Sequence, residues 1–206
     1  MVRKILANML GSFCSMLIRD RDLWRVLQCP HWPYWELFGD PTQRRPVTLA
    51  EERILMGELA QEAEIVSINF PQAIQIQTER EEDAIVETRA CMQEGVVAIY
   101  HPVIAIGELL SSPTMLVRVE EPSVFGAWQY VALRIKRNHY LRKEDLLIGA
   151  FDAYVLEGIQ GVRPPRSWQW SGDDERFEIV IEPVMEECVQ LVETIDRMMS
   201  GERPAP

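Results

Sequence analysis

The chain has 206 residues, which is enough for one domain of ordinary size. Apolar residues make up 47% of it and charged residues 26%, a composition that excludes a wholly disordered chain, a collagen-like repeat and a bundle of membrane spans. Lys and Arg number 21 against 32 Asp and Glu, so the formal net charge is −11. A protein with this charge needs a local basic patch to bind a phosphate backbone.

The cysteines and the first residues bear on the compartment. Cys14, Cys29, Cys91 and Cys188 are far apart and form no C-x-x-C pair, which favours reduced thiols and a cytoplasmic protein. Residues 1–19 imitate a short signal peptide, but polar residues interrupt the apolar run. We therefore expect an N-terminal leader helix or a start codon assigned too early, and no membrane partner.

The first half of the chain predicts helices. Residues 20–28 have apolar side chains at helical spacing. Residues 31–46 are unusually aromatic, and we expect that segment to pack against a sheet; an alternative is that an exposed part of it docks a partner. Thr48 and Glu51 form a capping box at the start of a helix that runs to about Val66, and a second helix is expected over residues 78–93.

After Gly95 the pattern changes to strands. Residues 96–106 are rich in β-formers and end at a Gly107-Glu108 turn, and further strands are expected over 115–119 and 128–136. A long helix over 143–160, two short strands at 167–170 and 176–181, and a last helix over 183–199 follow. This order predicts a mixed α/β fold (α+β), with a single domain over residues 20–200 and a loose tail over 201–206.

Several phrases occur in a recognisable order. Cys29-Pro-His-Trp and Trp35-Glu-Leu-Phe-Gly-Asp precede Pro113-Thr-Met-Leu, a strand that ends in Ile135-Lys136, and a long helix. Taken together, from about residue 20 to residue 206, the chain resembles the RecB-like branch of the PD-(D/E)XK nuclease superfamily. The resemblance implies a restriction-endonuclease-like core, in which helices flank a central mixed sheet.

The resemblance also implies a site. In such enzymes a helix Glu, a hairpin Asp and an acidic residue two positions before a Lys gather around Mg²⁺, which activates water. The helix Glu would be Glu64, with Glu62 as a near neighbour, and the Lys is present as Lys136. At the two other acid positions the chain has Thr114 and Arg134.

These departures predict a degenerate site. Thr is a poor ligand for Mg²⁺, and Arg134 places a permanent cation where the family has an anion. Ile148 and Asp152 also replace the family's Gln-x-x-x-Tyr. We expect no metal and no cofactor. Many relatives hold an Fe–S cluster, but Cys29 has no C-terminal cysteine triplet to complete one.

The remaining candidate is a basic stretch, in which Tyr140 could stack on a base and the cations could follow a phosphate backbone. An alternative interpretation is a solvated connection whose charges are balanced by nearby acids. The predicted nucleic-acid-binding residues are Arg134, Lys136, Arg137, Tyr140, Arg142 and Lys143.

Three hypotheses therefore stay open for function. The first is a non-cleaving module that binds DNA or a DNA-processing protein, and the second is a protein-interaction scaffold. The third is an active Mg²⁺-dependent DNA exonuclease that uses displaced carboxylates, namely Glu64, Glu120 or Glu121, with Lys136. The sequence indicates no oligomeric state.

Overall fold

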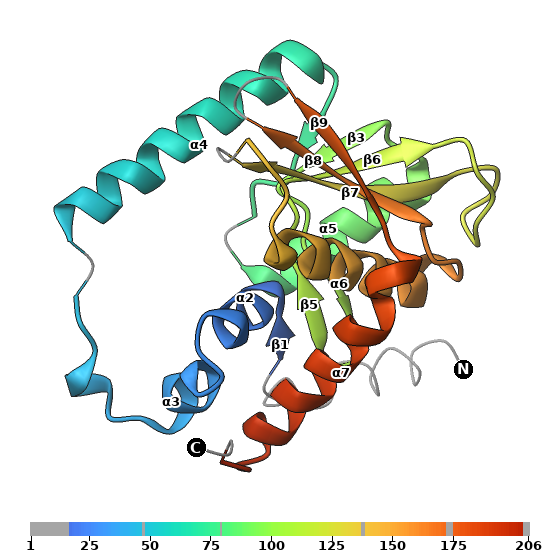
Figure 1. Cartoon of the computed structure of the whole chain (residues 1–206). Coiled ribbons are helices and arrows are strands. Elements are labelled where there is room, and N and C mark those ends of the chain that lie inside the picture. The colour runs from blue at the N-terminus through green and yellow to red at the C-terminus, as the bar shows by residue number, and fades with distance from the viewer. Residues whose placement is uncertain (1–16, 47, 79, 137–138, 172–174, 204–206) are drawn as a thin grey trace.

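A six-stranded mixed sheet forms the centre of the protein (Figure 1). The computed structural model describes residues 17–46, 48–78, 80–136, 139–171 and 175–203. The strand order in this sheet is β2-β3-β6-β7-β8-β9. The strands span Ile74–Gln75 (β2), Ala98–Tyr100 (β3), Met115–Val119 (β6), Gln129–Lys136 (β7), Arg166–Ser171 (β8) and Arg176–Val180 (β9).

The centre of the sheet is an antiparallel hairpin followed by a parallel strand. β6 pairs antiparallel with β7, and β8 then lies parallel to β7. A parallel neighbour requires a crossover connection, which here contains helix α6, Lys143–Gln160. The predicted mixed α/β class is confirmed, and this crossover positions α6 directly beneath the residues of interest on β7.

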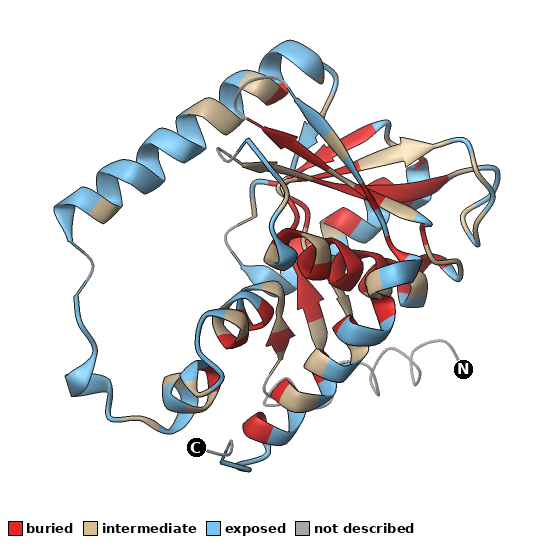
Figure 2. Cartoon of the chain, in the orientation of Figure 1, coloured by how far each residue is buried: buried red, intermediate tan, exposed pale blue. Residues whose placement is uncertain are grey.

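Helix α6 is the core of the molecule. It is apolar on most sides and is buried along most of its length (Figure 2), which is what its composition requires. It packs against the sheet and against helix α7, Glu182–Met199. Helices α2 (Asp20–Gln28) and α5 (Glu81–Glu94) complete this layer. At its end α6 is capped by Gly161 in the left-handed conformation, φ 71°, where glycine is favoured.

A second, smaller sheet lies beside the core. It joins β1 (Ile18–Arg19), β5 (Leu109–Ser111) and β4 (Ile104–Ile106). The continuous β-run expected over 96–106 is therefore wrong, because β3 and β4 belong to different sheets. His101 has a positive φ of 53° and Pro102 follows it, so the chain turns sharply between the two strands.

The aromatic segment also differs from its prediction. It forms helix α3, Trp32–Phe38, and a 3₁₀ turn η1, Pro41–Gln43. α3 packs on α2 and α7 and not on the sheet, and Trp35 and Phe38 are about half exposed. Helix α6 covers one face of the sheet, and a smaller apolar cluster that includes Val66 covers the other. Because both faces are already covered, α3 packs on the outside of the helical layer.

Helix α4, Leu49–Asn69, begins at the predicted capping box of Thr48 and Glu51. It runs three residues beyond the predicted end at Val66, whereas α5 begins three residues after the predicted start. Figure 1 shows α4 extending away from the body, joined to it only near its C-terminal end. Val66 is its one buried residue. Among the helices described, none is long and apolar enough to cross a membrane.

Candidate functional site

Arg134 is the centre of a largely buried polar cluster between the sheet and the helices. Its neighbours Leu133 and Ile135 pack on the α4 side of the sheet, so Arg134 faces α6. Its Nε donates to Asp152 Oδ2 at 2.7 Å, and its Nη2 donates to Asp152 Oδ1 at 2.8 Å. The same Nη2 donates to Asp20 Oδ2 at 2.7 Å, so one guanidinium joins β7, α6 and α2.

Burial makes this network strongly electrostatic. The Asp152 side chain is only 1% exposed and that of Arg134 16%. Burial by itself lowers the pKa of Arg134, but Asp152 and Asp20 raise it above the usual value for arginine, so the group stays charged. Ser111 Oγ donates to Asp152 Oδ1 at 2.5 Å and completes the cluster.

Lys136 is also engaged within the protein. Its Nζ forms an ion pair with Asp145, in the first turn of α6. The side chain of Asp145 is 3% exposed and its Oδ2 accepts a hydrogen bond from the backbone N–H of Arg142 at 2.9 Å. The lysine expected to orient a nucleophile is therefore bound to a buried carboxylate that also caps a helix.

On α4, the structure places Glu62 and not Glu64 against the sheet. Glu62 accepts hydrogen bonds from Tyr100 Oη at 3.0 Å and from Thr114 Oγ1 at 3.3 Å, and His101 Nε2 lies 2.8 Å from its Oε1. Burial and the charge of Glu62 raise the pKa of Tyr100 above its usual value. Glu64 lies on the exposed side of the helix.

Thr114, at the position of the hairpin acid, connects Glu62 to β7. Its Oγ1 accepts a hydrogen bond from the backbone N–H of Ile135 at 3.1 Å while donating to Glu62. The sequence-predicted positions 114, 134 and 136 do converge at one end of the β6–β7 hairpin, but each side chain is held by protein partners.

This arrangement does not fit a divalent metal ion. Arg134 stands where the second strand acid was expected, and its guanidinium bridges the carboxylates of Asp20 and Asp152. Among the described residues, no group of three or more His, Cys, Asp or Glu side chains is placed to hold a metal. A built-in cation therefore satisfies the carboxylates that would otherwise attract Mg²⁺.

The displaced acids of the third hypothesis lie elsewhere. Glu121 accepts a hydrogen bond from Gln129 at 2.6 Å and pairs with Arg166 at 2.7 Å, and Glu120 pairs with Arg118 at 2.8 Å. Gln129 and Lys136 are the two ends of β7, seven residues and therefore about 23 Å apart. The structure thus does not bring Glu120 or Glu121 to Lys136.

The predicted basic patch is largely compensated. Arg134 and Lys136 have the carboxylate partners described above, and Lys143 pairs with Glu187 at 2.5 Å. The Arg142 guanidinium lies over the Tyr140 ring at 5.3 Å, and Tyr140 is exposed. Arg137 lies outside the described residues, as do residues 1–16 of the expected leader and 204–206 of the tail.

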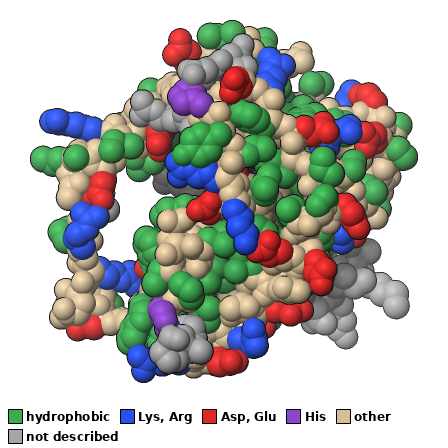
Figure 3. Space-filling view, in the orientation of Figure 1, with side chains coloured by type: hydrophobic (Ala, Val, Ile, Leu, Met, Phe, Trp, Pro, Cys, Tyr) green, Lys and Arg blue, Asp and Glu red, His purple; other side chains and the backbone are tan. Residues whose placement is uncertain are grey.

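Two adjoining hollows flank Lys136. The larger, about 610 Å³, lies between α4 and the end of β7, and its apolar lining is Leu55, Leu59 and Ile135. The smaller, about 220 Å³, lies between α2, β7 and α6 and is lined by Trp24, Arg21 and Arg134 among others. Figure 3 shows the opening between α4 and the body on this face of the molecule. We call the larger hollow the α4 cleft.

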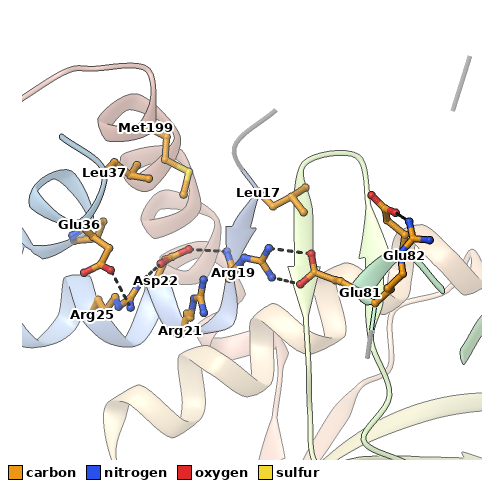
Figure 4. A pocket seen from close by; sticks show the side chains of 12 residues that line it. Leu17, Arg19, Arg21, Asp22, Arg25, Glu36, Leu37, Glu81, Glu82 and Met199 are labelled. Atoms are coloured by element: carbon orange, nitrogen blue, oxygen red, sulfur yellow. Dashed lines mark hydrogen bonds and ion pairs between the residues drawn. The ribbon is translucent and has the colours of Figure 1, made fainter. Parts of the chain in front are cut away.

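A third hollow, about 700 Å³, lies between α2, α3, α5 and α7 and shares Arg21 with the smaller hollow (Figure 4). Most of its charged side chains pair with one another. Arg19 donates to both carboxylate oxygens of Glu81, and Arg25 reaches Asp22 at 3.0 Å and Glu36 at 3.7 Å. We attribute these pairs to the docking of α2 against its neighbours rather than to ligand binding.

Sequence reasoning missed the acids that bind Arg134. The sequence pattern indicates Asp20 only as the start of a helix, and Asp152 only as a departure from the family motif. The sequence did contain a signal, namely an arginine in a predicted strand and an aspartate in the apolar helix expected to cover that strand. A buried cation needs a carboxylate partner, which would have pointed to Asp152. No protein-family model matches the chain, and a search of curated proteins finds no relative. Any function assigned to the chain therefore rests on the geometry of its site.

Proposed function

We propose that this chain is a non-cleaving protein with a RecB-like nuclease fold that serves as an accessory module to proteins that process nucleic acid, and that it works by binding. The order of hairpin, crossover helix and parallel strand supports this fold. The three described cysteines are free, which suits a reducing compartment such as the cytoplasm.

The observation that carries the proposal is the pairing of Arg134 with Asp20 and Asp152. Metal-dependent hydrolysis needs uncompensated carboxylates to hold the cation and an available lysine beside it. Here Arg134 satisfies the two carboxylates, and Asp145 binds Lys136. The residues that the resemblance assigns to a nuclease centre are paired with other side chains of the protein, which supports a role without metal-dependent cleavage.

A protein partner agrees better with these charges than a nucleic acid does. Counterion release, the main source of affinity for nucleic acid, requires cations that reach phosphates. Three of the five described members of the predicted patch, namely Arg134, Lys136 and Lys143, are paired with acids. The overall charge of −11 also repels the phosphates of any nucleic acid that approaches the protein.

Nucleic-acid binding remains a second candidate because of one specific arrangement. Trp24 and Arg21 are exposed and line the smaller hollow together with Lys136. Tyr140, which follows Lys136 by four residues in the sequence, is exposed as well. Aromatic rings and cations along one groove are typical of sites for single strands. This candidate predicts binding that is strongest at low salt.

One experiment tests these alternatives. Labelled single- and double-stranded DNA and RNA are incubated with the protein and Mg²⁺ or Mn²⁺, beside a Lys136→Ala variant as control. We expect no cleavage by either protein; cleavage that Lys136→Ala abolishes would overturn the proposal. The same samples on a native gel at low salt distinguish the candidates, since a shift that Trp24→Ala and Arg21→Ala remove favours the second.

A further inference from the structure

Most of α4 has no cover in the described structure. Its residues 52–60 are all exposed, and the helix meets the body only toward its C-terminal end (Figure 2). A helical segment of this length is marginally stable in water without tertiary packing. The capping box at Thr48 and Glu51 fixes where the helix starts, but it covers no apolar surface.

The uncovered part nevertheless carries large apolar side chains. Leu55 is 55% exposed and Leu59 42%, and both line the α4 cleft opposite Ile135 of β7. Ile54 and Met56 are exposed on the same two turns. Contiguous exposed apolar side chains at the edge of a hollow are typical of a binding surface.

Charge indicates what covers this surface. Helix α4 contains five Glu and one Arg, a formal charge of −4. Glu52, Glu58 and Glu64 make no ion pair with any described residue, so this charge is available to a partner. A second copy of the chain would bring two such helices together, and nucleic acid would add more negative charge. A basic partner is the one that complements the helix.

We propose that the α4 cleft binds a basic amphipathic helix from a partner protein, an inference that rests on the proposed accessory function. The apolar face of that helix would cover Leu55, Leu59 and Ile135, and its cations would lie along Glu52 and Glu58. This is the helix-in-groove mode of recognition. On the opposite wall Lys136 pairs with Asp145, whereas Arg142 keeps its charge over the Tyr140 ring, so the cations of the bound helix would lie toward α4.

The test uses model helices of defined chemistry. A fluorescent peptide of about 18 residues, five helical turns of Leu and Lys, is titrated with the full chain, and a Leu/Glu peptide with the same apolar pattern serves as its counterpart. We expect saturable one-to-one binding of the Lys peptide only. Leu55→Ser/Leu59→Ser should weaken it at least about tenfold, as expected for central apolar anchors.

Two further variants separate charge from general stickiness. Glu52→Lys/Glu58→Lys should weaken binding of the Lys peptide and reduce its dependence on salt. Val86→Ser/Val124→Ser, which removes two equally exposed valines elsewhere on the surface, should leave the affinity unchanged. Circular dichroism checks that each variant keeps its helix content, which we expect because these side chains are exposed.

Three results would overturn the inference. The first is that the Leu/Glu peptide binds as tightly as the Lys peptide. The second is that Val86→Ser/Val124→Ser weakens binding as much as Leu55→Ser/Leu59→Ser does. The third is that light scattering shows a dimer of the chain that Leu55→Ser/Leu59→Ser dissociates. Failure here is distinguishable from failure of the proposed function. Cleavage of nucleic acid would reject the accessory role itself, whereas absence of both cleavage and peptide binding would reject only this partner.

Discussion

Replacing Arg134 by Met tests whether its guanidinium holds the fold together. The change keeps a side chain of similar length but removes three charged hydrogen bonds of 2.7–2.8 Å, two to Asp152 and one to Asp20. Asp152, at 1% exposure, would then be a buried carboxylate without its cation. Removing one partner of a buried ion pair typically costs about 3–5 kcal/mol, and we expect Arg134→Met to fall in that range.

The measurement is urea unfolding followed by circular dichroism, with a thermal scan beside it. For a chain of this size the expected loss corresponds to a decrease in Tm of about 6–20 °C. The matched control is Arg134→Met/Asp152→Leu, which removes both charges of the closest pair. Because an apolar replacement of a whole buried pair is often neutral, this double variant should regain most of the lost stability.

The comparison of the two variants decides the interpretation. If Arg134→Met loses less than about 1 kcal/mol, the guanidinium contributes no more than an exposed pair would, and the assignment of a built-in cation is refuted. If the double variant is as unstable as the single one, the cost comes from lost packing around β7 and not from an unpaired Asp152. Arg134→Lys should be intermediate, because an ammonium lacks the guanidinium's planar fork.

Three other outcomes are expected from the structure. Gly149→Ala should destabilise the protein by about 1–3 kcal/mol in urea unfolding, because a Cβ there would collide with the Ser167 hydroxyl beneath α6. Burial raises the pKa of Cys188 to about 12. In a variant with Cys14 replaced by Ser, a thiol reagent at pH 8 should therefore label exposed Cys29 at once and buried Cys188 only on unfolding. Hydrogen bonds from Arg45 and Thr48 lower the pKa of Glu51 from 4.5 to about 2. Protonation of Glu51 removes this stabilisation of the capping box, so the start of α4 should lose protection from amide exchange as the pH falls from about 4.5 to 2. Glu51→Gln should remove that dependence on pH.

Local chemistry predicted the helices and strands that carry strong signals. The capping box of Thr48 and Glu51 and the glycine caps at Gly95 and Gly161 fixed helix ends within a few residues. The two-residue strands and the second sheet were not predicted, since pairings so short depend on distant partners. β1, for example, exists because Ile18 and Arg19 lie beside Leu109 and Leu110.

The sequence predicted which residues lie near one another in the site, but not which side chains they contact. The sequence indicated that Thr114, Arg134 and Lys136 would meet, and the hairpin register brings them to the same end of the sheet. The expected helix acid was Glu64, with Glu62 as a near neighbour, and the structure places Glu62 there instead. The two are 200° apart around α4, and the helix has apolar residues on several sides, so its pattern does not indicate which side faces the sheet. Only the contact with Thr114, Tyr100 and His101 identifies Glu62.

The two acids around Arg134 explain why an acidic side chain at position 134 should cost the protein stability. The resemblance leads us to expect an acid on β7 at position 134, whereas the chain has Arg134 there and an acid on α6 at Asp152. Arg134→Glu would place a third carboxylate beside Asp20 and Asp152 with no cation between them, a repulsion that the buried setting intensifies. Arg134 and its two acids therefore stabilise the fold as one unit. In the function that we propose, the Arg134 side chain takes the place of the metal cation that an active nuclease would bind.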